Sequence, residues 1–344
     1  MTRDAGTPVV AVVGRFAVRE AARLPALLGT AWRVAAVPSE ETQRTEVIGQ
    51  ARALVATRFD AGVPVGTDLE LIQSPVAGYD HVDLAAVPPQ ASFCNAREHE
   101  GAVAEYVLAA MLEWVIGLRR LDAGLRRGDW SGGVAVAGAH HRELAGATLG
   151  MIGLGQIAAA VAQRAAAFGV RVIAASHRPQ ARAAGVAEVL GFGDLDRLLG
   201  QSDFVLVCCA LDATTRGLID ARRLARMKPD AVLINVARAA IVDEAALFAV
   251  LHQRRIGGAV IDVWSHEPGL GEAAAPAGAL PFRELDNILM TPHAAAWTAG
   301  VVERRWRAVA ANLDRLVRGE PLANLVQGPR VQAPGARAPG GAAG

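Results

Sequence analysis

The chain has 344 residues, which is enough for two domains of ordinary size. Its formal net charge of +1 gives no reason to expect a nucleic acid or an acidic membrane surface as partner. Its three cysteines (Cys94, Cys208 and Cys209) lack metal or disulfide spacing, and no apolar run approaches the ~18 residues of a membrane span, so we expect a cytoplasmic protein with buried thiols, no metal site and no membrane partner.

The first part of the chain alternates short apolar runs with helix-like segments. The runs are VVAVVG at 9–14, RVAAV at 33–37, ALVAT at 53–57, LELIQS at 69–74 and SFCN at 92–95. This alternation is typical of an α/β domain with a parallel sheet. Ligands bind at loops that follow the carboxyl ends of such strands, so the loop at 76–80 is a candidate binding loop; a simple glycine turn is the equal alternative.

A long helix is predicted from Glu100 to about Arg127. Val103, Val107 and Trp114 lie on its apolar face. Such a helix belongs either to a core or to a subunit interface, and the pattern does not separate the two. GDWSGG at 128–133 ends it.

The stretch from 148 to 178 predicts a dinucleotide site. An apolar run at 149–152 precedes Gly153-Leu154-Gly155-Gln156-Ile157-Ala158, which fits the pattern G-x-G-x-x-G/A. A helix should follow, because Ile157, Val161, Ala165 and Phe168 have helical spacing, and a second apolar run occupies 170–175. Strand, glycine turn, helix and strand in this order favour a dinucleotide site over an ordinary crossover.

Each small residue of this motif has a separate physical role. Gly153 allows the tight turn, and Gly155 lets the backbone approach a pyrophosphate at the helix N-terminus. Ala158 takes the third position, where helix and strand pack closely.

The end of the second run indicates which dinucleotide is bound. An NAD site usually carries Asp or Glu there for the ribose 2′-hydroxyl, whereas this chain has Ser176-His177-Arg178. Arg178 offers a planar fork for a 2′-phosphate, although an Arg on a loop is often merely solvated. We therefore favour NADP(H), with NAD(H) as the alternative.

The remainder of the chain continues the α/β pattern. Further apolar runs occupy 204–209, 231–236, 257–262 and 287–290, giving at least six buried parallel strands from residue 149 onward. An amphipathic helix is expected from about Thr298 to Arg318. The tail after Gly328 contains Pro, Gly and Ala without large apolar periodicity, and we expect it to be disordered.

Three ionisable residues follow the carboxyl ends of these runs. Arg238 follows 231–236, Glu267 follows 257–262, and His293 follows 287–290. His is the natural acid or base for a carbonyl oxygen, a nearby carboxylate favours the charged imidazole, and a guanidinium can hold a substrate carboxylate. Each has an ordinary structural explanation alone, but their convergence at one sheet edge predicts a catalytic site.

Six blocks of the chain resemble the D-isomer-specific 2-hydroxyacid dehydrogenases, over a span from about Val9 to Val326. The blocks are VAGYDHVDL at 76–84, VAEYVLAAML at 103–112, LGMIGLGQI at 149–157, LINVARAAIVDEAAL at 233–247, GGAVIDVWSHEP at 257–268 and NILMTPHAAAWT at 287–298. The order and spacing of Arg238, Asp262, Glu267 and His293 also match.

The resemblance implies an α/β fold with two Rossmann-like or flavodoxin-like parallel-sheet domains, the coenzyme domain being inserted into a split substrate domain. The substrate domain would comprise 1–100 and 295–328, the dinucleotide-binding domain 101–294, and the disordered tail 329–344. It also implies a homodimer formed through the coenzyme domain, with the helix after Glu100 at the interface.

The resemblance also implies roles for individual residues. Arg238 would bind the substrate carboxylate and carbonyl, and Glu267 would pair with His293 as acid and base. The backbone of Val76, Ala77 and Gly78 would complete the carboxylate clamp. The expected coenzyme-site residues are Gly153, Gly155, Gln156, Ile157, Ser176, His177, Arg178, Cys209, Ala210, Val236, Ala237 and, near the nicotinamide, Asp262.

Several positions depart from the family pattern. Ser176 replaces a common Asp, which supports NADP(H). Ala210 replaces a frequent Pro and Ala239-Ala240 replace frequent glycines, which puts the exact shape of the nicotinamide pocket in doubt. Glu267 argues against the formate dehydrogenase branch, which uses Gln beside its His.

The sequence thus predicts an NAD(P)-dependent oxidoreductase that reduces a small 2-oxoacid such as glyoxylate or hydroxypyruvate, with NADPH favoured. Two alternatives remain: a non-catalytic NAD(H)-sensing scaffold of the same fold, and phosphite oxidation by the same three residues. The intact Arg238, Glu267 and His293 weigh against the scaffold.

Overall fold

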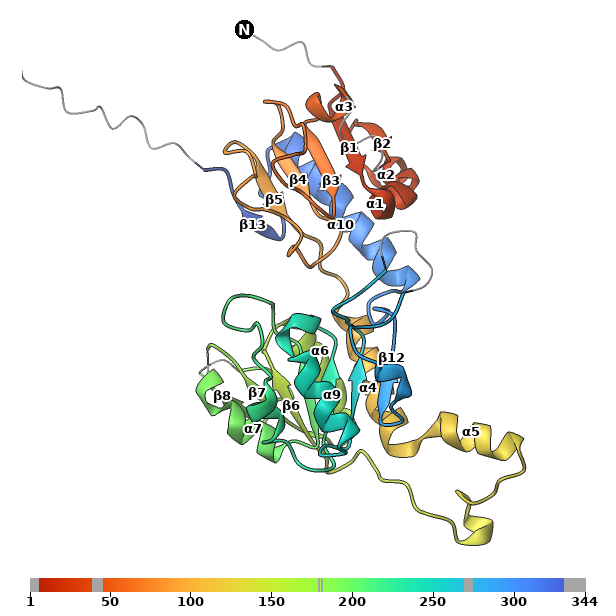
Figure 1. The fold of residues 1–344 in the computed structure, drawn as a ribbon. Coiled ribbons are helices and arrows are strands. Elements are labelled where there is room, and N and C mark those ends of the chain that lie inside the picture. The colour runs from red at the N-terminus through yellow and green to blue at the C-terminus, as the bar shows by residue number, and fades with distance from the viewer. Residues whose placement is uncertain (1–5, 39–45, 179, 181, 269–274, 331–344) are drawn as a thin grey trace, which may run out of the picture. The chain divides into compact units, whose positions relative to one another are not determined.

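The computed structural model describes residues 6–38, 46–178, 180, 182–268 and 275–330. The chain forms two compact units, and the first of them is discontinuous in sequence (Figure 1). Unit 1 consists of Met1–Glu98 and Ala299–Gly344, and unit 2 consists of His99–Thr298.

Unit 1 contains a six-stranded sheet. Its strands are β1 (Val9–Val13), β2 (Arg33–Val37), β3 (Ala53–Ala56), β4 (Leu71–Gln73), β5 (Ser92–Cys94) and β13 (Leu325–Gln327). The strand order is β13-β5-β4-β3-β1-β2, in which β1 to β5 are parallel and β13 runs antiparallel to β5. Its α-helices are α1 (Arg15–Glu20), α2 (Leu24–Leu27), α3 (Glu46–Gly49) and α10 (Ala299–Arg318).

Successive residues of a strand point to opposite sides of the sheet. The strands of this sheet are apolar on both sides, and helices and loops cover both faces. Val10 and Val12 pack in one cluster with Trp306 of α10. Ala11 and the α3 residue Ile48 belong to the cluster on the other face.

Unit 2 contains a seven-stranded sheet in which every pair is parallel. Its strands are β6 (Thr148–Ile152), β7 (Arg171–Ala175), β8 (Glu188–Leu190), β9 (Phe204–Val207), β10 (Val232–Asn235), β11 (Gly258–Ile261) and β12 (Ile288–Met290). Its α-helices are α4 (Glu100–Ile116), α5 (Leu118–Arg126), α6 (Gln156–Ala167), α7 (Leu195–Gln201), α8 (Ala221–Leu224) and α9 (Glu244–His252).

The unit 2 sheet is also covered on both faces. Helices α4 and α6 pack on the face that includes Leu149 and Met151, whereas α7, α8 and α9 pack on the face that includes Ile152. Two sheets of mainly parallel strands between helices confirm the predicted α/β class.

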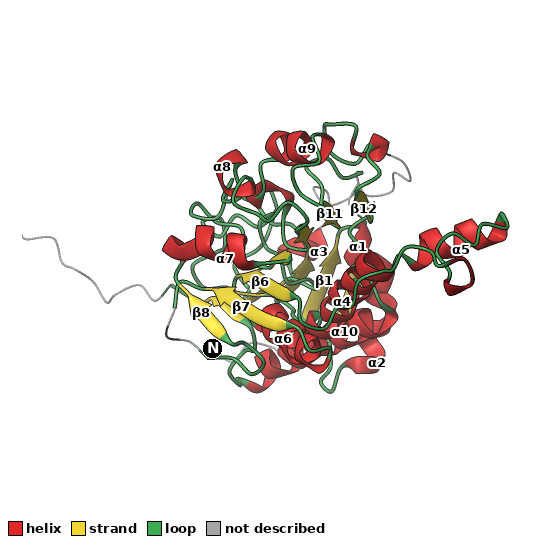
Figure 2. Ribbon diagram, turned by 90° about the horizontal axis from the view of Figure 1, so that it is seen from below, coloured by secondary structure: helices red, strands yellow, loops and turns green. Residues whose placement is uncertain are grey.

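The single long helix predicted from Glu100 to Arg127 is wrong. Gly117 has φ of 73°, a left-handed conformation that glycine adopts without steric cost, and it ends α4 and begins α5. The two helix axes differ by 52°. In both ribbon views α5 extends away from the unit 2 sheet (Figures 1 and 2).

Four smaller expectations also need correction. Short strands β8 and β13 were not anticipated, and Phe168 lies beyond the end of α6 with 44% of its surface exposed. Cys208 and Cys209 follow β9 and do not lie within it, so they belong to the sheet edge.

The boundary of the predicted disordered tail is also wrong. Arg330 is described, and its side chain donates hydrogen bonds to the carbonyls of Leu84 and Ala85 at 2.9 and 3.3 Å. Its backbone N–H donates to the Pro89 carbonyl at 2.7 Å. Residues 331–344 lie outside the described residues.

Among the described helices, no single one has the length and apolar composition needed to cross a membrane. The bent pair of α4 and α5 meets that test by length and composition alone, and most of the inner face of α4 packs in the unit 2 core.

Candidate active site

The candidate residues of unit 2 follow the carboxyl ends of its strands. The strand order is β12-β11-β10-β9-β6-β7-β8, so the chain moves outward from β6 to β8 and then returns to β9 on the other side of β6. The carboxyl edge beside such a reversal is where open parallel sheets bind their ligands. The loops after β6 and β9 lie at this point.

Gly153 begins the turn after β6, and the surrounding backbone requires a glycine there. Its φ is 109°, and a Cβ atom at this position would lie 2.9 Å from both Cα and N of Cys209. The Cys208 thiol lies 3.5 Å from the Ile152 carbonyl oxygen and 3.6 Å from that of Gly153. The loop after β9 is therefore packed directly against the glycine turn.

Gly155 differs from Gly153, because a Cβ atom there would meet no atom of the chain within 4 Å. It immediately precedes α6, whose 12 residues place backbone N–H groups at this end. Ala158 is fully buried against the sheet. Open space above Gly155 at a helix N-terminus fits the pyrophosphate of a dinucleotide.

The segment after β7 is exposed at His177 and Arg178. The Ser176 hydroxyl oxygen accepts a hydrogen bond from the Arg178 backbone N–H at 3.1 Å. The His177 ring stacks on Phe192, with centroids 4.1 Å apart and an interplanar angle of 2°. No carboxylate is present among Ser176, His177 and Arg178.

Asn235 shapes the turn that presents Arg238. It is the last residue of β10 and only 1% exposed. Its amide donates to the Arg238 carbonyl at 3.0 Å, and its side-chain oxygen accepts from the Ala237 N–H at 3.1 Å. The Arg238 guanidinium donates to the Ala237 carbonyl at 2.7 Å. Sequence reasoning missed Asn235, although it is the polar end of an apolar run.

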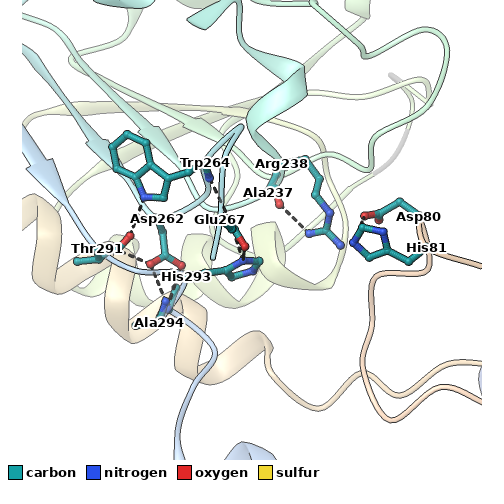
Figure 3. Close-up of polar contacts among 11 residues, drawn as sticks. Asp80, His81, Ala237, Arg238, Asp262, Trp264, Glu267, Thr291, His293 and Ala294 are labelled. Carbon is teal, nitrogen blue, oxygen red and sulfur yellow. Dashed lines mark hydrogen bonds and ion pairs between the residues drawn. The ribbon is translucent and has the colours of Figure 1, made fainter. Parts of the chain in front are cut away.

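His293 and Glu267 form a hydrogen-bonded pair after β12 and β11, which are adjacent strands (Figure 3). Nδ1 of His293 lies 3.1 and 3.0 Å from Oε1 and Oε2 of Glu267. The Trp264 backbone N–H donates to Oε1 at 3.1 Å and orients the carboxylate. Glu267 thus contacts Nδ1 of the imidazole and not Nε2. Since 47% of the His293 side chain and 38% of the Glu267 side chain are exposed, the pair is accessible to a substrate.

The turn that carries His293 is wrapped around the Asp262 side chain. Asp262 is 1% exposed, and its carboxylate accepts hydrogen bonds from Thr291 Oγ1 at 2.6 Å, Ala294 N at 2.8 Å and Ala295 N at 3.0 Å. Its carbonyl accepts from His293 N at 2.8 Å. His293 has φ of 54°, which is uncommon for a residue with a side chain. Asp262 therefore stabilises the conformation of this turn. The sequence did not reveal the part that Thr291 plays in it.

In unit 1, the predicted binding loop follows β4. The Val76 carbonyl accepts from Ala96 N at 3.1 Å and from the Ser74 hydroxyl at 3.1 Å. The Ala77 carbonyl accepts from the Asn95 amide at 2.7 Å. Within the described part of the chain, the backbone N–H groups of Ala77 and Gly78 donate no hydrogen bond to another group of the protein. The carbonyl side of the loop is thus fixed.

Burial keeps the thiols at the sheet edge protonated. It raises the pKa of Cys209 to about 11 and raises that of Cys208 further, the second effect being reinforced by the neighbouring Cys209. At neutral pH Cys208 is therefore a thiol that can donate weakly to backbone carbonyls. Among residues 6–38, 46–178, 180, 182–268 and 275–330, no three His, Cys, Asp or Glu side chains form a group that could hold a metal ion.

Comparison with known proteins shows the family to which this architecture belongs. The model of the D-isomer specific 2-hydroxyacid dehydrogenase NAD binding domain matches residues 108–295. A glycerate dehydrogenase from Methylorubrum extorquens is 33% identical over 264 residues, covering 76% of this chain and 79% of the relative. A D-3-phosphoglycerate dehydrogenase from Methanocaldococcus jannaschii is 31% identical; the match covers 76% of this chain but only about half, 48%, of that longer relative.

A solved structure agrees over nearly the whole chain. It is an NADPH-dependent glyoxylate/hydroxypyruvate reductase from Sinorhizobium meliloti in complex with NADP and sulfate. It is 25% identical with a TM-score of 0.78, and the match covers 93% of this chain and 98% of that one. The present chain belongs to the D-isomer specific 2-hydroxyacid dehydrogenase family. It is an oxidoreductase of the NAD(P)-dependent class that acts on 2-hydroxyacids.

Proposed function

We propose that this enzyme reduces a small 2-oxoacid, glyoxylate or hydroxypyruvate, with NADPH. The observation that carries the proposal is the Glu267–His293 pair, with both carboxylate oxygens within 3.1 Å of Nδ1, after two adjacent strands. Arg238 follows the next strand of the same sheet. An acid, its carboxylate partner and a guanidinium at one sheet edge suit reduction of a keto acid.

The coenzyme would lie along the loops after β6, β7, β9 and β10. Gly153, Gly155 and the first turn of α6, including Gln156 and Ile157, would hold its pyrophosphate. The 2′-phosphate would lie beside Ser176, His177 and Arg178, where the guanidinium can pair with it. Cys209, Ala210, Val236 and Ala237 would line the path toward the nicotinamide. When bound, the reduced nicotinamide supplies the hydride.

The chemistry of the chain itself is proton transfer and orientation. His293 would give a proton to the keto oxygen from Nε2, because Glu267 engages Nδ1. Glu267 would fix the orientation of the ring through its contact with Nδ1. Arg238 would bind the substrate carboxylate and polarise the carbonyl. Asp262 would act by holding the turn of His293.

For the substrate carboxylate we further propose the backbone of Val76, Ala77 and Gly78 as ligands. The carbonyls of Val76 and Ala77 are engaged inside the loop, which leaves the N–H groups of Ala77 and Gly78 as candidate donors. This assignment makes residues 1–100 and 295–328 the substrate domain and residues 101–294 the coenzyme domain. The match of the family model to residues 108–295 supports the second part.

We also propose a homodimer that uses α4, α5 and the segment after them. This segment exposes large apolar side chains, which are Leu118, Leu125, Trp130, Val134 and Val136, with Val134 99% exposed. An apolar surface on an extended element is typical of an interface between subunits. Light scattering after size exclusion should give twice the chain mass, and Trp130→Arg with Val134→Glu should reduce it to the mass of one chain.

The decisive experiment is a panel of 2-oxoacids assayed with NADPH and with NADH through the absorbance of the reduced nicotinamide. We expect the highest kcat/KM for glyoxylate or hydroxypyruvate with NADPH. Ser176→Asp with Arg178→Ala should reverse the coenzyme preference, because a carboxylate binds the ribose diol and repels a phosphate. A wild-type preference for NADH would contradict the coenzyme assignment.

The same panel separates the alternatives. Turnover of phosphite with an oxidised coenzyme, without reduction of any 2-oxoacid, would replace the proposed substrate. Coenzyme binding with no turnover of any compound would favour a sensor.

A further inference from the structure

The hydroxyl and carbonyl groups of Thr291 take part in three hydrogen bonds in the turn before His293. Its hydroxyl oxygen lies 2.6 Å from Asp262 Oδ1 and 2.6 Å from the hydroxyl oxygen of Tyr106. Its carbonyl accepts from Trp264 Nε1 at 2.9 Å (Figure 3). The residue therefore connects helix α4 with the loops after β11 and β12.

The direction of these bonds follows from the number of protons. A threonine hydroxyl has one proton, and an ionised carboxylate only accepts. The Thr291 proton therefore goes to Asp262, and Tyr106 donates its own proton to Thr291. Burial raises the pKa of Tyr106 to about 12, so the phenol remains a donor throughout the pH range of an ordinary assay.

Asp262 is the common acceptor of the hydrogen bonds from Thr291 and from the backbone around His293. Asp262 accepts from the N–H groups of Ala294 and Ala295, and its carbonyl accepts from that of His293. These bonds surround a residue with φ of 54°, a conformation that persists in a residue with a side chain only where its surroundings favour it. A weaker bond to Asp262 would allow this turn to relax and the imidazole to move relative to Glu267.

We propose that Tyr106 of helix α4 is a positioning residue for His293, acting through Thr291 and Asp262 on the left-handed turn that carries the imidazole. The inference rests on the proposed function, in which His293 is the acid of keto reduction. In this proposal Tyr106 acts through Thr291 and Asp262 and not by direct contact with substrate or coenzyme. It extends the site from the loops to a helix of the core.

The test removes the hydroxyl groups one at a time. Tyr106→Phe and Thr291→Val keep the shape of the side chain and delete one link each. Residue-resolved amide hydrogen exchange should be faster at Ala294 and Ala295 in both variants, and kcat for 2-oxoacid reduction should fall about fivefold in Tyr106→Phe, the usual scale for one neutral hydrogen bond. KM for the coenzyme should not change, because the glycine turn is not part of this chain of bonds.

A double-mutant cycle decides whether the two hydroxyls act in series. If they do, Tyr106→Phe combined with Thr291→Val should have the same kcat and exchange rates as Thr291→Val alone. Met111→Leu, a volume-conserving change on the buried face of the same helix, is the control and should leave exchange at Ala294 unchanged.

Wild-type exchange at Ala294 and Ala295 in Tyr106→Phe, or strictly additive effects in the double variant, would overturn the inference. A wild-type enzyme that reduces no 2-oxoacid would refute the proposed function instead. In that case the exchange measurement still decides whether Tyr106 holds the turn.

Discussion

Two turns at the carboxyl edge of the same sheet reach a left-handed conformation in different ways. After β6, Gly153 has φ of 109° and packs against the Cys209 backbone, so the absence of a side chain is what permits the turn. After β12, His293 has φ of 54° and keeps its side chain, and Asp262 holds the turn through backbone hydrogen bonds.

The sequence therefore specifies the conformation of the two turns in two different ways. The glycine turn is specified by residue types that are adjacent in sequence. The His293 turn is specified by contacts from residues as distant as Asp262 and Tyr106. It can therefore present a side chain from a residue in the left-handed conformation, which a glycine turn cannot do.

The largest expected effect comes from removing the side chain that the second turn presents. His293→Ala should lower kcat for reduction roughly 10²- to 10⁴-fold, the usual scale for a lost general acid. Coenzyme binding, measured by fluorescence titration, should be retained because the glycine turn is untouched. Full activity in this variant would remove His293 from the mechanism.

A second prediction breaks the contacts that hold the His293 turn. Asp262→Asn keeps the size of the side chain but replaces one acceptor oxygen with a donor, so at least one of Thr291, Ala294 and Ala295 loses its partner. Since a hydrogen bond to a charged group is worth about 1.5–3 kcal/mol, kcat should fall roughly 10- to 100-fold. The variant should also unfold at a lower temperature in a calorimetric scan. An unchanged kcat would show that the turn keeps its conformation without the full set of hydrogen bonds to Asp262.

A third prediction breaks the glycine turn. Gly153→Ala places a Cβ atom 2.9 Å from the Cys209 backbone and forces an unfavourable φ. The strain should cost about 1–3 kcal/mol, which lowers the Tm of a domain of this size by several degrees. Coenzyme affinity should fall as well. Wild-type stability in this variant would mean that the β9 loop can move away.

These two turns also show how far the sequence could be interpreted. The glycine motif predicted its strand, turn and helix correctly, because each feature depends on local residue types and apolar spacing. The α/β class followed from the same signals. The separation of α4 from α5 was missed because the helical spacing of apolar residues continues past Gly117 at Leu118, Leu121 and Leu125, and spacing alone does not mark a left-handed residue.

The His293 turn could be predicted only in part. His293 and Glu267 could be singled out because both follow apolar runs, and resemblance suggested their pairing. Thr291 and Tyr106 could not be found, because they are 185 residues apart and meet only after the sheet has formed. A hydroxyl on an otherwise apolar helix gives no local indication of its partner.

A fourth prediction separates the two glycines of the first turn. Gly155→Ala adds a methyl group where no atom of the chain lies within 4 Å, so the Tm should stay at the wild-type value. KM for NADPH should rise roughly tenfold if the open space is used by a pyrophosphate, because one unfavourable contact of about 1.4 kcal/mol corresponds to that factor. An unchanged KM would place the coenzyme away from Gly155.

The smallest expected effect concerns the charge of Glu267, which has no counterpart in the glycine turn. Glu267→Gln keeps the shape of the side chain and a hydrogen bond to Nδ1 of His293, but it replaces the carboxylate acceptor with a neutral amide. A hydrogen bond to a charged group exceeds a neutral one by about 1 kcal/mol, so kcat for reduction at pH 7 should fall roughly fivefold. KM for NADPH, measured in the same assay, should stay at the wild-type value because the glycine turn is untouched. Gly155→Ala should instead raise KM for the coenzyme and leave kcat unchanged. An unchanged kcat in Glu267→Gln would show that the carboxylate only orients the ring, a role that the neutral amide can also fill.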